Sequence, residues 1–414
     1  MSATEREQFG RYKVLSAGIF SLVLVMGVAR FSYTPLLPLM RQQAGLSLAA
    51  GGWLAALNYA GYLCGALLAS QISDLQLKDK LYRTGMVVAV LSTAVMAAST
   101  EVWLWAASRF LGGLSSAAGM LFGTGLILNW LIRHQHRSEL GIHFSGIGLG
   151  IALSAIAAAL MLMLGLDWRD QWLAFACLGC LLLWPALRWL PRPEAAPSGA
   201  SAALMADRPP GSRFLRLLMA SYFCAGIGYV VSTTFIVAIV DALPGLQGRG
   251  TWVFMVMGLA AAPSCMLWDL IARRTGDVLA LVLAALLQIV GIVLPVWPGG
   301  FAAALLGSVL FGSTFVGMVS LVLTMAGRYY PSHPAKMMGR MTLSYGCAQI
   351  IGPALTAWLA QQFGSYGAGL YMAAAVMAVG AMLLAAMLGP ASANAQTSTV
   401  NELPGGLSKS ANRN

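Results

Sequence analysis

The chain has 414 residues, of which 58% are hydrophobic and 9% are charged, whereas soluble domains carry about 25% charged residues. Together with a mean hydropathy of +0.75, this composition excludes a soluble globular domain and predicts an all-α polytopic membrane protein. The net charge of +11 does not indicate nucleic-acid binding, because the basic residues lie in short segments between apolar runs rather than on one soluble face.

Twelve apolar runs follow one another along the chain, each of about the length that crosses a hydrocarbon core roughly 30 Å thick. They predict 12 transmembrane helices. Residues 1–13 have mixed charge and no cleavage site follows the first run, so we expect this run to stay in the membrane. In chain order, the runs cover residues 14–40, 49–72, 84–100, 102–131, 139–165, 170–190, 214–240, 250–272, 278–297, 300–327, 339–362 and 367–389.

The segment between the sixth and seventh runs differs in composition from its neighbours. Residues 191–213 are rich in Pro, Ala, Ser and Gly, which predicts a linker. It separates an N-terminal six-helix half, residues 1–190, from a C-terminal six-helix half, residues 214–389. The polar residues 390–414 predict a disordered tail.

The two halves show weak internal similarity. An offset of 199 residues places Trp53 on Trp252 and Thr34 on Thr233, and an offset of 198 places Gly141 on Gly339. Agreement over several helix pairs indicates two parallel halves related by a pseudo-two-fold axis, a 6+6 plan known among transporters.

The basic residues predict the orientation of the chain. Of the 25 Lys and Arg residues, 20 lie in segments on the side that carries both termini and residues 191–213, and three lie on the other side. Positive charge favours the cytoplasmic side, so we expect both termini, the linker and the tail to be cytoplasmic. Arg30 and Arg109 remain within the membrane.

Several motifs resemble the major facilitator superfamily (MFS). Ser70 to Lys80 resembles the loop between helices 2 and 3 of that family, with Asp74 and Lys78 as the matching charges, although Leu75 and Leu77 replace its usual arginine and second glycine. A second copy holds Asp269 and Arg273. The resemblance implies that these four residues belong to gating loops.

Two further segments extend this resemblance. Arg109 to Gly113 resembles the arginine–glycine motif of the fourth MFS helix, and Gly146, Gly148 and Gly150 form a looser glycine motif in the fifth. The segment Arg30 to Met40 is similar to the YbfB/YjiJ group of bacterial inner-membrane transporters. The resemblance covers the membrane domain and implies secondary active transport by alternating access in the bacterial inner (plasma) membrane.

Arg30 is the most informative single residue. A charge at mid-bilayer costs from roughly 2.5 to more than 10 kcal/mol, so an arginine retained there is expected to face a polar cavity or a partner. Tyr33 and Thr34 share its helical face at spacings of three and four. The resemblance implies a cavity lined by helices 1, 4, 7 and 10 with 2, 5, 8 and 11 beside them. The polar candidates for this cavity are Arg30, Tyr33, Thr34, Asn58, Tyr62, Arg109, Tyr229, Thr233, Tyr345 and Gln349.

These residues predict a positive site. Arg30 and Arg109 lie within apolar runs, and no Asp or Glu lies near the middle of any run. We therefore expect a small organic anion, such as a carboxylate, held by charge-assisted bonds from Arg30. The structural alternative for Arg30 is a bond to carbonyls freed near Pro35 and Pro38, and Arg109 has a structural or gating alternative.

Other functions remain open. The aromatic residues also suit efflux of amphipathic or drug-like compounds, and a non-transporting membrane sensor or a membrane-embedded enzyme are alternatives from other classes. No phosphate-binding loop is present, and we expect no enzymatic activity and no cofactor. His136, Glu139 and His143 suggest a metal site or proton relay, but an ordinary basic loop is the expectation. We expect a monomer that contacts membrane lipid and no nucleic acid, and the resemblance implies protons as coupling ion.

Overall fold

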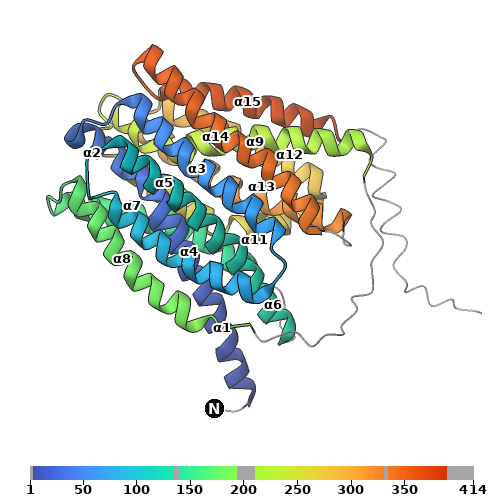
Figure 1. Cartoon of the computed structure of the whole chain (residues 1–414). Helices are drawn as coiled ribbons and strands as arrows, with labels where there is room; N and C mark the ends of the chain where they lie inside the picture. The colour runs from blue at the N-terminus through green and yellow to red at the C-terminus, as the bar shows by residue number, and fades with distance from the viewer. Residues whose placement is uncertain (1–2, 135–139, 194–209, 331–333, 389–414) are drawn as a thin grey trace, which may run out of the picture.

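The structure is a computed structural model that describes residues 3–134, 140–193, 210–330 and 334–388. His136, Glu139, the central part of the expected linker and the expected tail lie outside these residues. All regular secondary structure in the described chain is helical, and the helices pack side by side in one bundle (Figure 1).

Residues 3–193, here the first half, contain ten helical segments, two of them π-helical (η1, η2). They are α1 (Ala3–Leu22), η1 (Val23–Phe31), α2 (Tyr33–Ala44), α3 (Leu48–Gln71), α4 (Leu75–Val95), α5 (Val102–Ala117), η2 (Ala118–Phe122), α6 (Gly123–Arg133), α7 (Leu140–Met163) and α8 (Trp168–Trp189).

Residues 210–388, here the second half, contain eight helical segments, one of them a short 3₁₀ helix (η3). They are α9 (Ser212–Asp241), α10 (Gly250–Ala261), α11 (Ser264–Thr275), α12 (Asp277–Val293), η3 (Leu294–Val296), α13 (Gly300–Tyr329), α14 (Pro334–Phe363) and α15 (Gly367–Ala385).

Each of the twelve apolar runs falls on one helix or on consecutive helices. Among the described residues, nine helices are long and apolar enough to cross a membrane, or ten if α10 and α11, bent by 48°, form one span. The prediction of 12 spans is therefore met in part. The helices that fall short are α4, whose first nine residues include four charges, and α14, which carries Arg340, Gln349 and Gln361.

The break between α10 and α11 occurs where the sequence led us to expect one continuous helix. Pro263 lies between these two helices. Its ring nitrogen has no proton to donate, and its ring clashes with the carbonyl four residues earlier. The chain therefore bends at this residue and resumes as α11.

The first membrane helix is also irregular, but its irregular segment lies about one turn before Pro35 rather than at the prolines. The segment η1 has π-helical geometry, with Ser32 N donating to Gly27 O at 2.9 Å. Stretches of π-helical geometry inside α-helices are frequent at functional sites. The helix then continues through Pro35 and Pro38 to Ala44, where Gly45 ends it in the left-handed conformation, φ 70°. A residue without Cβ adopts that conformation at little cost.

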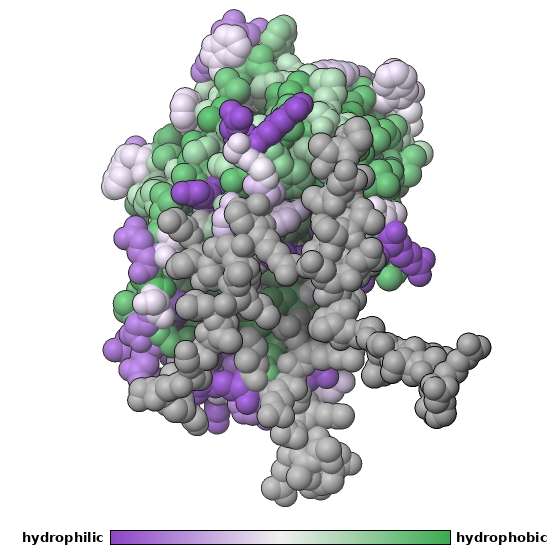
Figure 2. Space-filling view, turned by 90° about the vertical axis from the view of Figure 1, so that its right-hand side faces the viewer, coloured by the Kyte–Doolittle hydropathy of each residue, from purple (hydrophilic) through white to green (hydrophobic). Residues whose placement is uncertain are grey.

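The two ends of the bundle differ. The end where α1 and α9 begin and α8 ends, called the basic end, carries the basic loops, and the other end is called the opposite end. Figure 2 looks onto the side that faces right in Figure 1 and shows hydrophilic residues among hydrophobic ones where the surface is not covered by residues drawn in grey. Large hydrophobic residues such as Leu181, Trp184 and Met382 are exposed on the bundle, as expected for side chains that contact lipid.

Three helix pairs make most of the contacts between the two halves: α3 with α14, α7 with α10, and α2 with α9. In the described chain, the hydrogen bonds and ring contacts across this boundary lie between the middle of the bundle and the opposite end. They link Thr34 to Thr233, Tyr59 to Thr234 and Tyr229, Phe31 to Phe254, and Tyr366 to Leu48 and Arg41.

Tyr366 joins the two halves at the opposite end. Its hydroxyl donates to Leu48 O at 2.6 Å, its ring stacks on Phe235 with centroids 4.5 Å apart, and Arg41 lies 5.9 Å from the ring centroid. Burial raises the pKa of the Tyr366 phenol, and the positive charge of Arg41 opposes this shift in part. The phenol therefore stays protonated at neutral pH and keeps its hydrogen bond across the two halves.

Candidate substrate site

Arg30 lies near the middle of the bundle, on η1, with 3% of its surface exposed. Its guanidinium carbon is 4.2 Å from the centroid of the Tyr59 ring and 4.7 Å from that of Tyr62. Such cation–π contacts contribute up to about 2 kcal/mol when desolvated. One nitrogen, Nη1, is 3.8 Å from Met26 Sδ, whereas Nε and Nη2 have no hydrogen-bond partner.

The free atoms of Arg30 share one edge of the guanidinium plane. Nε and Nη2 project their protons on the same side, which is the geometry that grips both oxygens of one carboxylate. The alternative role of Arg30, a bond to carbonyls near Pro35 and Pro38, is not found among the described residues. Arg30 therefore presents a bidentate donor edge inside an aromatic surround.

Arg109 takes the structural role that we considered for Arg30. From α5, its Nη1 donates to Ala29 O at 3.2 Å and to Arg30 O at 3.4 Å, and its Nη2 also donates to Arg30 O at 3.4 Å. These carbonyls end the π-helical segment just before Pro35, where the regular ladder is interrupted. Arg109 therefore supports the backbone that carries Arg30.

Tyr33 and Asn58 hold Arg109 in place. The Arg109 guanidinium lies 4.5 Å from the centroid of the Tyr33 ring, and the Tyr33 hydroxyl donates to Gly51 O at 2.8 Å. Asn58 Nδ2 donates to Arg109 O at 2.8 Å, while its Oδ1 is buried without a partner. Both sequence candidates therefore lie beside Arg109 rather than at the free edge of Arg30.

Tyr62, by contrast, belongs to the surround of Arg30. Besides its ring contact with the guanidinium, its hydroxyl contacts Met120 Sδ at 3.3 Å. Met120 lies on η2, the second π-helical segment of the first half.

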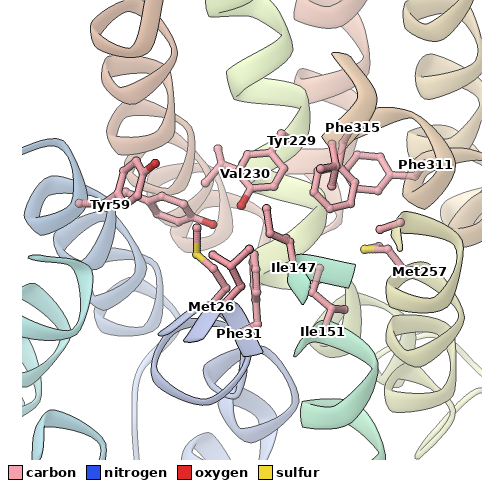
Figure 3. Close-up of a cluster of buried hydrophobic side chains, with 14 of the residues drawn as sticks. Met26, Phe31, Tyr59, Ile147, Ile151, Tyr229, Val230, Met257, Phe311 and Phe315 are labelled. Carbon is pink, nitrogen blue, oxygen red and sulfur yellow. The ribbon is translucent and has the colours of Figure 1, made fainter. Parts of the chain in front are cut away.

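The second half contributes an aromatic series. Tyr229 packs edge-on against Tyr59 at 6.4 Å between centroids and stacks on Tyr345 at 5.7 Å and Phe315 at 5.2 Å. Tyr345 stacks on Tyr222 at 4.5 Å. Figure 3 shows Tyr59, Tyr229, Met26 and Phe31 gathered together, with Phe315 and Phe311 continuing away from them. The sequence candidates Tyr229 and Tyr345 are therefore connected to Arg30 through Tyr59.

Gln349 lies one helical turn from Tyr345 on α14 and is buried, with its Oε1 lacking a hydrogen-bond partner. Its direction follows from its neighbours on the helix. Gly346 and Pro353 face α3, while Ala348 and Gly352 face α9. At 100° per residue, Gln349 and Tyr345 point between these two helices, toward Tyr229 and Arg30.

Thr34 and Thr233 meet each other. Thr34 Oγ1 donates to Thr233 O at 2.8 Å, and Thr233 Oγ1 donates back to Tyr229 O on its own helix at 2.9 Å. Residues placed on one another by the internal offset are thus in contact across the halves. The two hydroxyls serve helix contacts, so neither is free for a ligand in this structure.

Tyr59, which contacts both Arg30 and Tyr229, was not among the residues predicted from the sequence. The Asn58–Tyr62 spacing of four drew attention to the neighbouring face of the same helix. Tyr59 and Tyr62 are three residues apart and also share a face, so a search at that spacing would have found them. Met26 and Phe31 were missed because apolar residues in a membrane helix carry no signal of their own.

The gating-loop candidates form local contacts. The Asp74 carboxylate accepts from the backbone N–H groups of Gln76 and Leu77, each at 3.1 Å, and so caps α4. Asp269 pairs with Arg273 on α11 at 2.7 Å in an exposed ion pair, and such pairs contribute about 0–1 kcal/mol. Lys78 lies on the first turn of α4, partly buried.

His143 is buried in the first half, with Nε2 at 3.0 Å from Thr124 Oγ1. Its suggested partners His136 and Glu139 lie outside the described residues. Within the described part of the chain, no group of three or more His, Cys, Asp or Glu side chains could hold a metal ion.

The site has a net positive charge. The buried charged side chains of the described residues are Arg30, Arg109 and Asp79, and Asp79 pairs with Arg83 at 2.9 Å. That pair lies at the start of α4, at the basic end. The two central arginines are therefore without a counter-ion in the described chain, and an anion at Arg30 would offset the cost of burying its charge.

The chain is similar in structure to solved transporters. It superposes on the crystal structure of a point mutant of the nucleoside transporter NupG with a TM-score of 0.73 at 13% identity, covering 91% of this chain and 100% of that chain. For NupG without that mutation, the TM-score is 0.67 at 14% identity, covering 91% and 98%. At this identity, the likeness shows the fold alone.

The sequence comparisons agree with the fold. No curated protein sequence matches the chain. The family model MFS_4, described as "Uncharacterised MFS-type transporter YbfB", matches residues 22–385. The chain is therefore a multi-pass membrane protein, and it belongs to the MFS_4 family of MFS-type transporters.

Proposed function

We propose that this protein is a secondary active transporter of a small organic anion, such as a carboxylate, with Arg30 as the group that binds the acid. The observation that carries the proposal is the unpaired edge of Arg30, Nε and Nη2, buried in the middle of the bundle. A protein gains little from a buried charge that has no partner. A substrate that supplies the partner would explain why the charge is there.

The proposed architecture has twelve spans in two parallel six-helix halves, residues 1–190 and 214–389, joined by residues 191–213. Counting α4 and α14 with the ten candidate spans gives this number. The contact between Thr34 and Thr233, which the internal offset relates, supports a pseudo-two-fold axis near this point. The basic loops support a bacterial inner-membrane protein with both termini and residues 390–414 in the cytoplasm.

The proposed cycle is alternating access, in which the halves rock around the central site. The polar and ring contacts between the halves lie from the middle to the opposite end, with Tyr366 bound to Leu48. In our proposal, this arrangement closes the site toward the opposite end, and the reverse state breaks these contacts. The protein acts as a monomer and uses protons as coupling ion.

Two other substrate classes have a specific observation in their favour. NupG transports nucleosides, which are neutral, and the aromatic series would stack their bases. The same series would suit efflux of amphipathic or drug-like compounds. Neither class explains Arg30, because a neutral substrate would leave the guanidinium without a counter-ion.

A binding experiment separates these classes. We expect carboxylates to raise the melting temperature of the purified wild-type protein and to have no effect on Arg30→Gln, since a ligand at about a hundred times its Kd stabilises by about 2.7 kcal/mol. Arg216→Gln, which removes an exposed arginine, is the matched control and should respond like wild type. In proteoliposomes, a protonophore should abolish uphill uptake of the same carboxylate.

The proposal fails if carboxylates stabilise wild type and Arg30→Gln equally. It also fails if uridine or a bulky amphipath stabilises both proteins and no carboxylate does.

A further inference from the structure

The aromatic series at the boundary between the halves begins beside the Arg30 guanidinium and has no assigned role. It comprises Tyr59, Tyr229, Tyr345 and Phe315, with neighbouring centroids 5.2 to 6.4 Å apart. In a membrane protein, a helix interface is usually filled by small residues or aliphatic chains. Here four rings from four helices, α3, α9, α13 and α14, occupy the boundary between the halves next to a buried cation.

Side chains of both halves beside this group carry polar atoms without partners. Arg30 presents Nε and Nη2 from the first half, and Gln349 presents Oε1 from the second half, one turn from Tyr345. Both side chains are more than nine-tenths buried. A buried polar atom without a partner costs about 1–3 kcal/mol, so two such residues beside one set of rings indicate a ligand with polar groups on a flat body.

We infer that the substrate is an aromatic carboxylate, whose acid group binds Arg30 and whose ring packs against Tyr229 and Tyr345. This inference rests on the proposed function and narrows it. A carboxylate gripped by Nε and Nη2 lies in the plane of the guanidinium. In an aryl carboxylate the ring continues in that plane, so the acid that binds Arg30 also brings a flat π system beside the tyrosines.

A hydroxyl or amine group on the ring would donate to Gln349 Oε1. A saturated acid of the same size has neither the flat shape nor the π face, because its ring is puckered and thicker. Aromatic pairs are worth about 0.5–1.5 kcal/mol beyond their buried area. The site is therefore expected to prefer the aryl acid over the saturated acid at equal charge and equal carbon count.

The experiment compares benzoate with cyclohexanecarboxylate on the purified full-length protein by calorimetric titration. We expect wild type to bind benzoate about five- to tenfold more tightly. Tyr345→Leu should bring the two affinities close together, and Tyr345→Phe should keep the preference because the ring remains. Tyr371→Leu, which removes an exposed tyrosine of α15, is the control and should leave the ratio as in wild type.

The outcomes distinguish this inference from the proposed function. Equal binding of the two acids to wild type, lost in Arg30→Gln, would overturn the aromatic preference and leave the anion transporter in place. Absence of benzoate binding would also overturn the inference. Binding of both acids that persists in Arg30→Gln would contradict the proposed function itself. If Tyr345→Leu does not fold, the affinities of wild type and Tyr345→Phe for the two acids still test the preference for the aryl acid.

Discussion

Arg30 and Arg109 are both buried arginines of the first half, and they differ in what their guanidinium groups contact. Arg109 donates to two backbone carbonyls, Ala29 O and Arg30 O. Arg30 contacts rings and one sulfur atom and keeps two nitrogens free. The Arg109 charge stabilises the fold because it satisfies backbone carbonyls. The Arg30 charge destabilises the fold as long as it has no partner.

Replacing Arg109 should therefore damage the fold more than replacing Arg30. In Arg109→Gln, the carbonyls of Ala29 and Arg30 lose charged donors, at about 1–3 kcal/mol for each group left unsatisfied. We expect a lower melting temperature and weaker carboxylate binding, since the backbone under Arg30 loses its support. Arg109→Lys should recover part of both. Arg30→Gln should keep or raise the melting temperature, because it removes a buried charge without a counter-ion.

Melting curves of the three variants without ligand, followed by titration with benzoate, test this assignment. A melting temperature of Arg109→Gln equal to that of wild type would show that Arg109 does not support η1.

At the scale of helices, glycines set how closely α7 and α10 approach each other across the two halves. A Cβ on Gly258 would lie 2.7 Å from Gly148 O and 2.8 Å from Ile151 Cγ2, and a Cβ on Gly148 would lie 2.6 Å from Gly258 O. Gly148 belongs to the glycine motif of the sequence, together with Gly150, whose backbone meets Gly27 of η1. Close backbone contact is the usual reason for small residues between membrane helices.

A larger residue at Gly258 should keep the halves apart at the contact between α7 and α10. Overpacking costs about 1–3 kcal/mol, and here that cost falls on the state in which α7 and α10 touch. We expect Gly258→Leu to reduce uptake strongly while the protein still inserts and purifies. Gly339→Leu is the matched control, because a Cβ at Gly339 meets nothing within 4 Å. Uptake by Gly258→Leu at the rate of the control would contradict the role of this contact.

At the scale of the whole molecule, the proposed topology follows from charge and can be measured directly. With 20 of the 25 basic residues on one side, we expect a fluorescent protein fused after residue 414 to fluoresce in a bacterial cell and alkaline phosphatase at the same site to be inactive. Alkaline phosphatase inserted between Pro244 and Gly245, at the opposite end, should be active. The reverse pattern would overturn the orientation and the cytoplasmic termini.

The helical elements could be predicted from the sequence because they depend on local composition, and the family could be predicted because short motifs resemble it. A run of about 20 apolar residues must be helical in a membrane, where every backbone group needs an internal partner. This constraint located all twelve runs on helices, for example 48–71 where 49–72 was expected. It did not reveal the bend at Pro263 or the π-helical segment before Pro35, because these depend on which neighbours receive the freed carbonyls.

The sequence also determined that a charge lies in the membrane, since Arg30 stands in an apolar run whatever its neighbours are. Only the tertiary structure decided which of the two arginines supports the backbone and which keeps a free edge. The same holds for Tyr59, whose contacts with Arg30 and Tyr229 join α3 to η1 and α9. The physical reason is that burial follows from composition, whereas the partner of a buried polar group depends on distances between helices far apart in the chain.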